Sequence, residues 1–100
     1  MKTIVNGHQY SLDNVEGGHS PLQFIHKENI NGILTTIANG TTNEEVLRVL
    51  IDRINYLQNS VPSIENVVVI TKLEEALKWL ENRTADQTQG EKLFNLISKI

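Results

Sequence analysis

The spacing of apolar residues changes near residue 40, so the chain divides into two parts. Over residues 1–40, short runs that mix apolar and polar residues are separated by Asn-Gly pairs at 6–7, 31–32 and 39–40 and by Gly-Gly at 17–18. Asn-Gly between such runs is typical of a β-hairpin, because both central residues of a type I′ turn need a positive φ. The first part is therefore predicted to be β-rich.

Three strands are predicted in this part. Residues 2–5 and 8–12 flank Asn6-Gly7 and are expected to form a two-stranded ribbon. Residues 21–27 are expected to form a third strand, with Pro21 at an edge, where its missing N–H does no harm. Residues 33–37 are β-branched but few, and they fit either a strand or the start of a helical turn.

A first helix is predicted from a capping box at its start to about Asn59. Thr42 can accept a hydrogen bond from an unpaired N–H of the first turn, and Glu45 can reach back to the Thr42 N–H. Glu44 and Arg48 stand four residues apart and are expected to pair on the outer face. Apolar residues recur at three- and four-residue steps and predict one buried stripe: Leu47, Leu50, Ile54 and Leu57.

A second helix is predicted from Ser63, which suits the N-cap position, to about Arg83. Pro62 separates it from the first helix, and residues 84–90 are expected to form a polar break after it. A short amphipathic helix then follows within residues 93–100. The apolar stripe of the second helix is predicted to be Val67, Ile70, Leu73, Leu77 and Leu80.

The predicted fold class is α+β, in one domain over residues 1–100. A small N-terminal antiparallel β-sheet (1–40) packs on a long antiparallel helical hairpin (41–84), followed by a linker and a short extra C-terminal helix (85–100). Two helices and a small ribbon leave much apolar surface uncovered in a chain this short, so a two-fold dimer is expected. A monomer in which the C-terminal helix covers the stripe is the alternative.

Composition narrows the class of protein. The 100 residues include no cysteine, which excludes disulfides, thiolate metal sites and cysteine nucleophiles and fits a reducing cytoplasm. The net charge of −3 argues against binding to a nucleic acid polymer, which needs many Lys and Arg contacts to phosphate. No apolar run is long enough to span a membrane, and no signal-peptide core follows the first residues.

No catalytic or metal-binding arrangement is visible. The three histidines, His8, His19 and His26, match no metal-ligand spacing and are interpreted as surface or partly packed residues. There are no glycines of a nucleophile elbow, no GxGxxG and no P-loop lysine. We therefore expect no catalytic residue, no metal and no cofactor.

Residues near the connection between the helices and at the end of the second helix could instead bind a ligand. Asn66 offers a donor and acceptors that suit a purine edge, and Arg83 offers a planar cation for a base or a phosphate. Tyr56 and Leu57 lie before the connection. Each also has a plain structural interpretation: packing for Tyr56 and Leu57, a first-turn polar residue for Asn66, and a helix-dipole partner for Arg83.

Residues 41–84 resemble a phage helical-hairpin family that Thoeris anti-defence and anti-CBASS proteins share. The resemblance is carried by Asn43-Glu44-Glu45, Glu65-Asn66, the string Leu73-Glu74-Glu75-Ala76, Trp79-Leu80 and Arg83-Thr84. It implies a non-catalytic sponge that sequesters cyclic ADP-ribose isomers, which bacterial TIR enzymes make as an alarm signal. Some members also hold cyclic oligonucleotides of the CBASS system at a separate site. It further implies action in the host bacterial cytoplasm, as a homodimer or a hexamer built as a trimer of dimers.

The same resemblance assigns site residues. Asn66 matches the family's adenine-contacting Asn, and Arg83 matches the Arg that stacks on the base. Leu57 stands where the family usually has a stacking Phe, and Tyr56 is adjacent to it. Lys27, in an upstream stretch that resembles the family's β-rich part, is also counted as a candidate ligand-binding residue.

Spacing along the second helix adds a constraint on the site. Asn66 and Arg83 are separated by 17 residues, or about 25 Å of helix, so one copy cannot supply both contacts to a small cyclic nucleotide. A head-to-tail dimer would bring Asn66 of one chain to Arg83 of the other. Three alternatives stay open: a sponge for cyclic oligonucleotides, a protein-interaction module without a small ligand, and an enzyme that degrades the signal.

Overall fold

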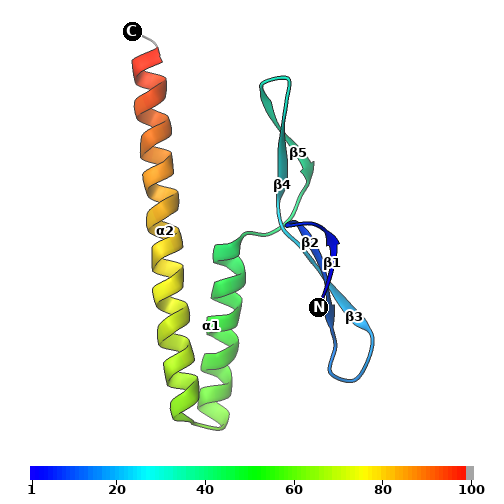
Figure 1. The fold of residues 1–100 in the computed structure, drawn as a ribbon. Helices are drawn as coiled ribbons and strands as arrows, with labels where there is room; N and C mark the ends of the chain where they lie inside the picture. The colour runs from blue at the N-terminus through cyan, green and yellow to red at the C-terminus, as the bar shows by residue number, and fades with distance from the viewer. Residues whose placement is uncertain (99–100) are drawn as a thin grey trace. The chain divides into compact units, whose positions relative to one another are not determined.

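The computed structural model describes residues 1–98, and the side chains of residues 1–85. Five strands precede two helices (Figure 1). The chain forms two compact units, Met1–Asn43 and Glu44–Ile100. The predicted α+β class and helical hairpin are confirmed, whereas the packing of the sheet on the hairpin stays a prediction.

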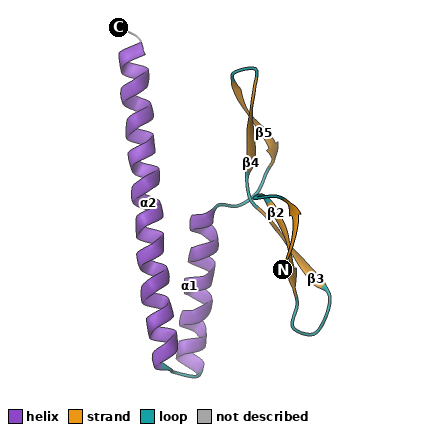
Figure 2. Cartoon of the chain, viewed as in Figure 1, coloured by secondary structure: helices purple, strands orange, loops and turns teal. Residues whose placement is uncertain are grey.

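The first unit holds two small antiparallel sheets (Figure 2). One consists of β1 (Lys2–Val5), β2 (Gln9–Asp13) and β3 (His19–Gln23) in that order. The other pairs β4 (His26–Ile30) with β5 (Ile33–Ala38). Pro21 lies in β3, at the edge of its sheet as expected, and residues 33–37 belong to a strand rather than a helical turn.

The single strand predicted over residues 21–27 is wrong, because the chain changes sheets at Phe24 and Ile25. The Phe24 N–H donates to the His8 carbonyl at 2.8 Å, and the Ile25 N–H donates to the Thr41 carbonyl at 2.9 Å. Thr41 in turn donates its N–H to the Gln23 carbonyl at 2.9 Å. These backbone bonds come from residues far away in the sequence, so they end β3 before β4 begins.

The Asn-Gly pairs form different turns. At Asn31-Gly32 both residues have positive φ, 53° and 82°, as the two-residue turn between β4 and β5 requires. At Asn6-Gly7 only the glycine does, at 77°, and the His8 N–H donates to the Val5 carbonyl at 2.9 Å. The type I′ turn expected at Asn6-Gly7 is therefore wrong, and the conformation there is that of a type II turn.

The second unit is the helical hairpin of α1 (Asn43–Ser60) and α2 (Ile64–Ser98), which run antiparallel and side by side (Figure 1). Helix α1 begins directly after Thr42, as the capping box predicts. Ser63 caps α2, because its Oγ accepts the Asn66 N–H at 3.1 Å. Both predicted helix starts are thus found.

The polar break predicted at residues 84–90 is wrong, and so is the separate C-terminal helix. Helix α2 continues through this segment to Ser98. The segment contains no proline, and its single glycine costs a helix only about 1 kcal/mol. The amphipathic face predicted within residues 93–100 involves side chains outside the described ones.

Most of the half-buried residues of both helices recur at three- and four-residue steps and form what we call the inner stripe, along which α1 and α2 face each other. Leu50 and Leu57, predicted to belong to it, are 42% and 38% exposed, and Val67 is 51% exposed. Apolar residues stand next to one another along both helices, so periodicity alone could not select the partner-facing set. The inner stripe consists of Leu47, Ile51, Ile54 and Gln58 in α1, and of Asn66, Ile70, Leu73, Leu77 and Leu80 in α2.

No described side chain is fully buried. The first unit has only half-buried contacts near the strand junction, where the His8 and His26 rings stack at 3.7 Å and Tyr10 meets Phe24 edge-on at 6.0 Å. Such a chain gains little from burial within one copy.

Candidate ligand-binding site on the helical hairpin

Asn66 is held in the first turn of α2, next to the connection between the helices. Its N–H is fixed by the Ser63 cap at 3.1 Å, and the Ser63 N–H donates to the Gln58 Oε1 at 2.9 Å. The Asn66 Nδ2 lies 3.5 Å from the Val61 carbonyl, a weak contact. Its Oδ1 accepts no hydrogen bond from the described part of the chain, so it stays available to a ligand.

Leu57 and Tyr56 lie on different sides of α1. Successive helical residues are rotated by about 100°, so Leu57 flanks the inner-stripe residue Gln58 while Tyr56 points to the back of the helix. Tyr56 is 64% exposed and Leu57 is 38% exposed. Of the two candidates, Leu57 is the one beside the inner stripe.

Arg83 lies far along α2 from Asn66. It is exposed, and it forms no ion pair or hydrogen bond with the described residues. Both residues belong to one uninterrupted helix, so the 17-residue separation corresponds to about 25 Å. The structure places Asn66 and Leu57 at the closed end of the hairpin and does not bring Arg83 to them.

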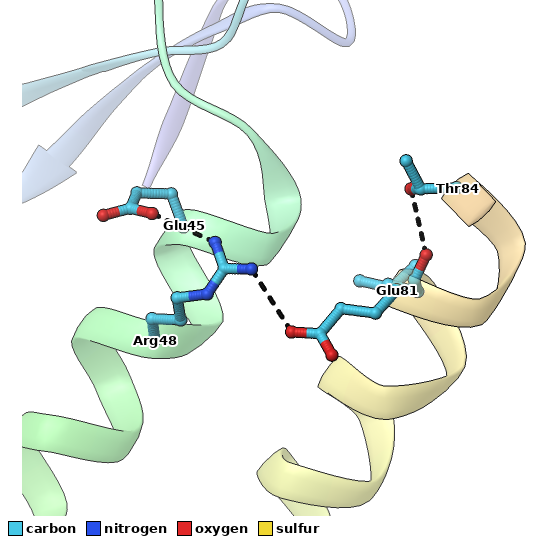
Figure 3. Close-up of polar contacts among 5 residues, drawn as sticks. Glu45, Arg48, Glu81 and Thr84 are labelled. Carbon is cyan, nitrogen blue, oxygen red and sulfur yellow. Dashed lines mark hydrogen bonds and ion pairs between the residues drawn. The ribbon is translucent and has the colours of Figure 1, made fainter. Parts of the chain in front are cut away.

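One side of the hairpin is polar, and there the Arg48 side chain connects α1 to α2 (Figure 3). Its guanidinium lies 3.1 Å from Glu45 and 3.2 Å from Glu81 of α2. These carboxylates, Glu45 first, raise the pKa of Arg48. The expected pairing of Arg48 with Glu44 is wrong, because Glu45 and Glu81 are the partners within reach. Sequence spacing could have suggested the pair with Glu45 but not the contact with the other helix.

The Arg48–Glu81 pair also identifies the two sides of the hairpin. Arg48 directly follows the inner-stripe residue Leu47, and Glu81 directly follows the inner-stripe residue Leu80. The Arg48 and Glu81 side chains contact each other. Positions that follow the inner stripe therefore share one side in both helices, and positions that precede it share the other. We call the first the polar side and the second the apolar side.

The apolar side carries both Leu57 and Arg83. Leu57 directly precedes the inner-stripe residue Gln58, and Arg83 directly precedes the next position in the three- and four-residue spacing of the inner stripe. Its residues repeat at alternating steps of three and four, as on a helix face that packs against another helix. Trp79 is 70% exposed there and Val69 is 41% exposed. The apolar side consists of Val46, Leu50, Arg53 and Leu57 in α1, and of Glu65, Val69, Lys72, Ala76, Trp79 and Arg83 in α2.

Among the described residues, other candidate chemistry lies in the first unit. His26 contacts Glu28 at 3.0 Å and His19 contacts Asp13 at 3.3 Å. No three His, Cys, Asp or Glu residues within the described part are placed to hold a metal ion. Lys27 lies exposed in β4, and its role in ligand binding stays a prediction. No helix within the described residues has the length and apolarity to cross a membrane.

Comparisons with known proteins match the region that contains these side chains. The model of a family described as "Acb2/Tad1, hairpin domain" matches residues 23–85. A protein of Bacillus phage SBSphiJ7 named "Thoeris anti-defense 1" is 51% identical over 53 residues, which cover 52% of this chain and 37% of that protein. The chain therefore matches little more than a third of the length of this relative.

Proposed function

The chain belongs to the Acb2/Tad1 hairpin-domain family, and on this basis we propose that it is a phage anti-defence sponge. It binds a cyclic ADP-ribose isomer, the signal that bacterial Thoeris TIR proteins make, and sequesters it without cleavage in the host cytoplasm. The relative named for Thoeris anti-defence supports this class of function. The observation that carries the proposal is the placement of Arg83 and Leu57 on one exposed apolar side of the hairpin.

The binding site is formed by two copies of the chain. Asn66 and Leu57 at the closed end of one hairpin face Arg83 of the other, which lies about 25 Å along its own α2. A two-fold head-to-tail dimer provides this arrangement twice. The exposed apolar side gives the two copies a surface on which to associate.

Each side chain contributes a distinct contact. The free Asn66 Oδ1 accepts from the amino group of an adenine, while the Nδ2 can donate to a ring nitrogen. The Arg83 guanidinium stacks on the base or binds the pyrophosphate. Leu57 supplies apolar contact without an aromatic face, so it forgoes a stacking interaction worth roughly 1–3 kcal/mol.

Calorimetric titration with a panel of cyclic ADP-ribose isomers tests the proposal. Asn66→Ala and Arg83→Ala should each weaken binding by about ten- to a hundredfold, and Leu57→Phe should strengthen it. Lys78→Ala, which removes a cation from the polar side, is the matched control and should bind as the wild type does. Tight binding that survives both Ala substitutions at the site would refute the assignment.

A sponge for cyclic di- or trinucleotides is the second candidate, favoured by the Acb2 part of the family description. Heat denaturation of purified protein followed by mass spectrometry identifies what was held. Intact cyclic ADP-ribose supports the first candidate, and an intact cyclic oligonucleotide supports the second. A ligand that is consumed with turnover would indicate an enzyme instead.

A further inference from the structure

The α2 residues of the apolar side form a series that is spaced symmetrically about position 74 and has opposite charges at its two ends. Its acidic end is Glu65 and its basic end is Arg83, with Val69 and Trp79 inside them and Lys72 and Ala76 at the centre. Glu65 and Arg83 lie equally far from the midpoint of this series. The same is true of Val69 and Trp79, and of Lys72 and Ala76. Two copies of this face can therefore pack antiparallel with every position opposite its counterpart.

We propose that Glu65 of one copy pairs with Arg83 of a second copy, and that this pair is released when an anionic ligand binds. In the same register Val69 lies opposite Trp79, and Lys72 lies opposite Ala76. The partner is a second copy of this chain. The part that concerns the ligand rests on the proposed function.

Charge selects this arrangement over the alternatives. A parallel contact of the same faces would set Glu65 against Glu65 and Arg83 against Arg83, and such like-charge contacts cost free energy. The antiparallel contact replaces both with attractive pairs. Neither Glu65 nor Arg83 has an ion pair with the described residues of its own chain.

Trp79 supplies the apolar anchor for the same contact. Its side chain is 70% exposed, and large aromatic side chains in such positions tend to carry much of the energy of an interface. Val69 of the second copy, 41% exposed, lies opposite. The polar side has no comparable aromatic anchor, because its apolar residue is Val67.

A ligand with a pyrophosphate competes with Glu65 for the Arg83 guanidinium. Glu65 faces Arg83 in this register, so its carboxylate would lie close to phosphates that Arg83 binds and would repel them. Neutralising Glu65 should therefore weaken the empty dimer and tighten the binding of the ligand. A residue with a purely structural role would not change the two affinities in opposite directions.

A charge exchange tests the pairing without any ligand. Sedimentation equilibrium should show that Glu65→Arg and Arg83→Glu each weaken dimerisation by about tenfold or more, because each creates a like-charge contact. The double variant should recover to within about threefold of the wild type. A monomeric wild type, or a double variant as weak as the two changes combined, overturns the pairing.

Cysteine cross-linking tests the register independently, because the chain contains no cysteine of its own. Mixed Val69→Cys and Trp79→Cys proteins should form a disulfide, since opposite residues lie within the reach of about 7 Å between Cα atoms. Each variant alone should not, because its two cysteines would be separated by about 15 Å along the helix axis. Equal cross-linking in the single-variant samples overturns the register.

Titration of Glu65→Gln with the cyclic ADP-ribose isomer that the wild type binds tests the competition, at a protein concentration at which the variant is dimeric. The affinity should rise by about two- to tenfold, as expected when one unfavourable charge is removed. An unchanged or lower affinity overturns it. If no isomer binds the wild type, the proposed function fails, whereas the charge exchange still decides the pairing.

Discussion

Gly40 lies against the backbone where the chain changes sheets, and Gly40→Ala should open that junction. An added Cβ would lie 2.6 Å from the Phe24 carbonyl carbon and 2.7 Å from its oxygen, with the Gln23 oxygen closer still. All three are backbone atoms, which cannot rotate away. The φ of Gly40 is not positive, so space rather than conformation requires the glycine here.

The cost can be worked from the neighbouring hydrogen bonds. Ordinary contact begins near 3.4 Å, so the 2.6 Å contact alone requires the two segments to separate by about 0.8 Å, and the closer Gln23 oxygen requires more. The Ile25–Thr41 and Thr41–Gln23 bonds, both 2.9 Å, would then exceed hydrogen-bonding distance. At about 1 kcal/mol for each bond, the junction should lose about 2 kcal/mol.

Amide hydrogen exchange is the direct assay, because it reports on the junction alone. A loss of about 2 kcal/mol should speed exchange at the Ile25 and Thr41 amides by about thirtyfold where local opening controls it. Gly32→Ala is the control: nothing lies within 4 Å of its Cβ, and only its φ of 82° opposes alanine, so the junction amides should not change. Equal protection of these amides in Gly40→Ala and the wild type would refute the steric argument.

Two further predictions concern a helix cap and a surface carboxylate. Ser63→Ala should cost about 1 kcal/mol in urea denaturation by removing the acceptor of the Asn66 N–H, whereas Ser60→Ala, at the end of the preceding helix, should cost less. The Met1 ammonium, 2.9 Å from Asp13, lowers the pKa of that carboxyl. Its contribution to stability is therefore present above the ordinary carboxyl pKa and is lost as the pH falls through the lowered value. Asp13→Asn should be less stable than the wild type at neutral pH and equal to it in strong acid, and a difference that persists in acid would contradict this origin.

The helical hairpin could be predicted from sequence because its signals are local. The Ser63 cap and the three- and four-residue spacing each lie within a few turns of helix, and the structure follows them. The change of sheets at Phe24 could not be predicted in this way. It depends on hydrogen bonds to His8 and Thr41, whose distances in sequence no local pattern encodes.

The candidate site was predictable only in part. The distance between Asn66 and Arg83 follows from counting residues along one helix, and the continuous α2 preserves it. Which of Tyr56 and Leu57 lies beside the inner stripe depends on which stripe faces the partner helix. Because Leu50 and Ile51 are adjacent and both apolar, the sequence offered two overlapping stripes, and only the packing of α1 on α2 distinguished them.

The two sides of the hairpin have different roles: one joins the helices within a copy, and the other is the surface for a second copy. The Arg48–Glu81 pair is exposed, so it adds little stability, but it joins α1 to α2 on one side and shows which sides of the two helices meet. The packing of α1 on α2 leaves Trp79, Leu57 and Arg83 on the opposite side, where all three are exposed. A hairpin whose described side chains all remain partly exposed gains from covering this side with a second copy. A ligand held between Asn66 of one copy and Arg83 of the other would then stabilise the dimer, because it binds only the associated state.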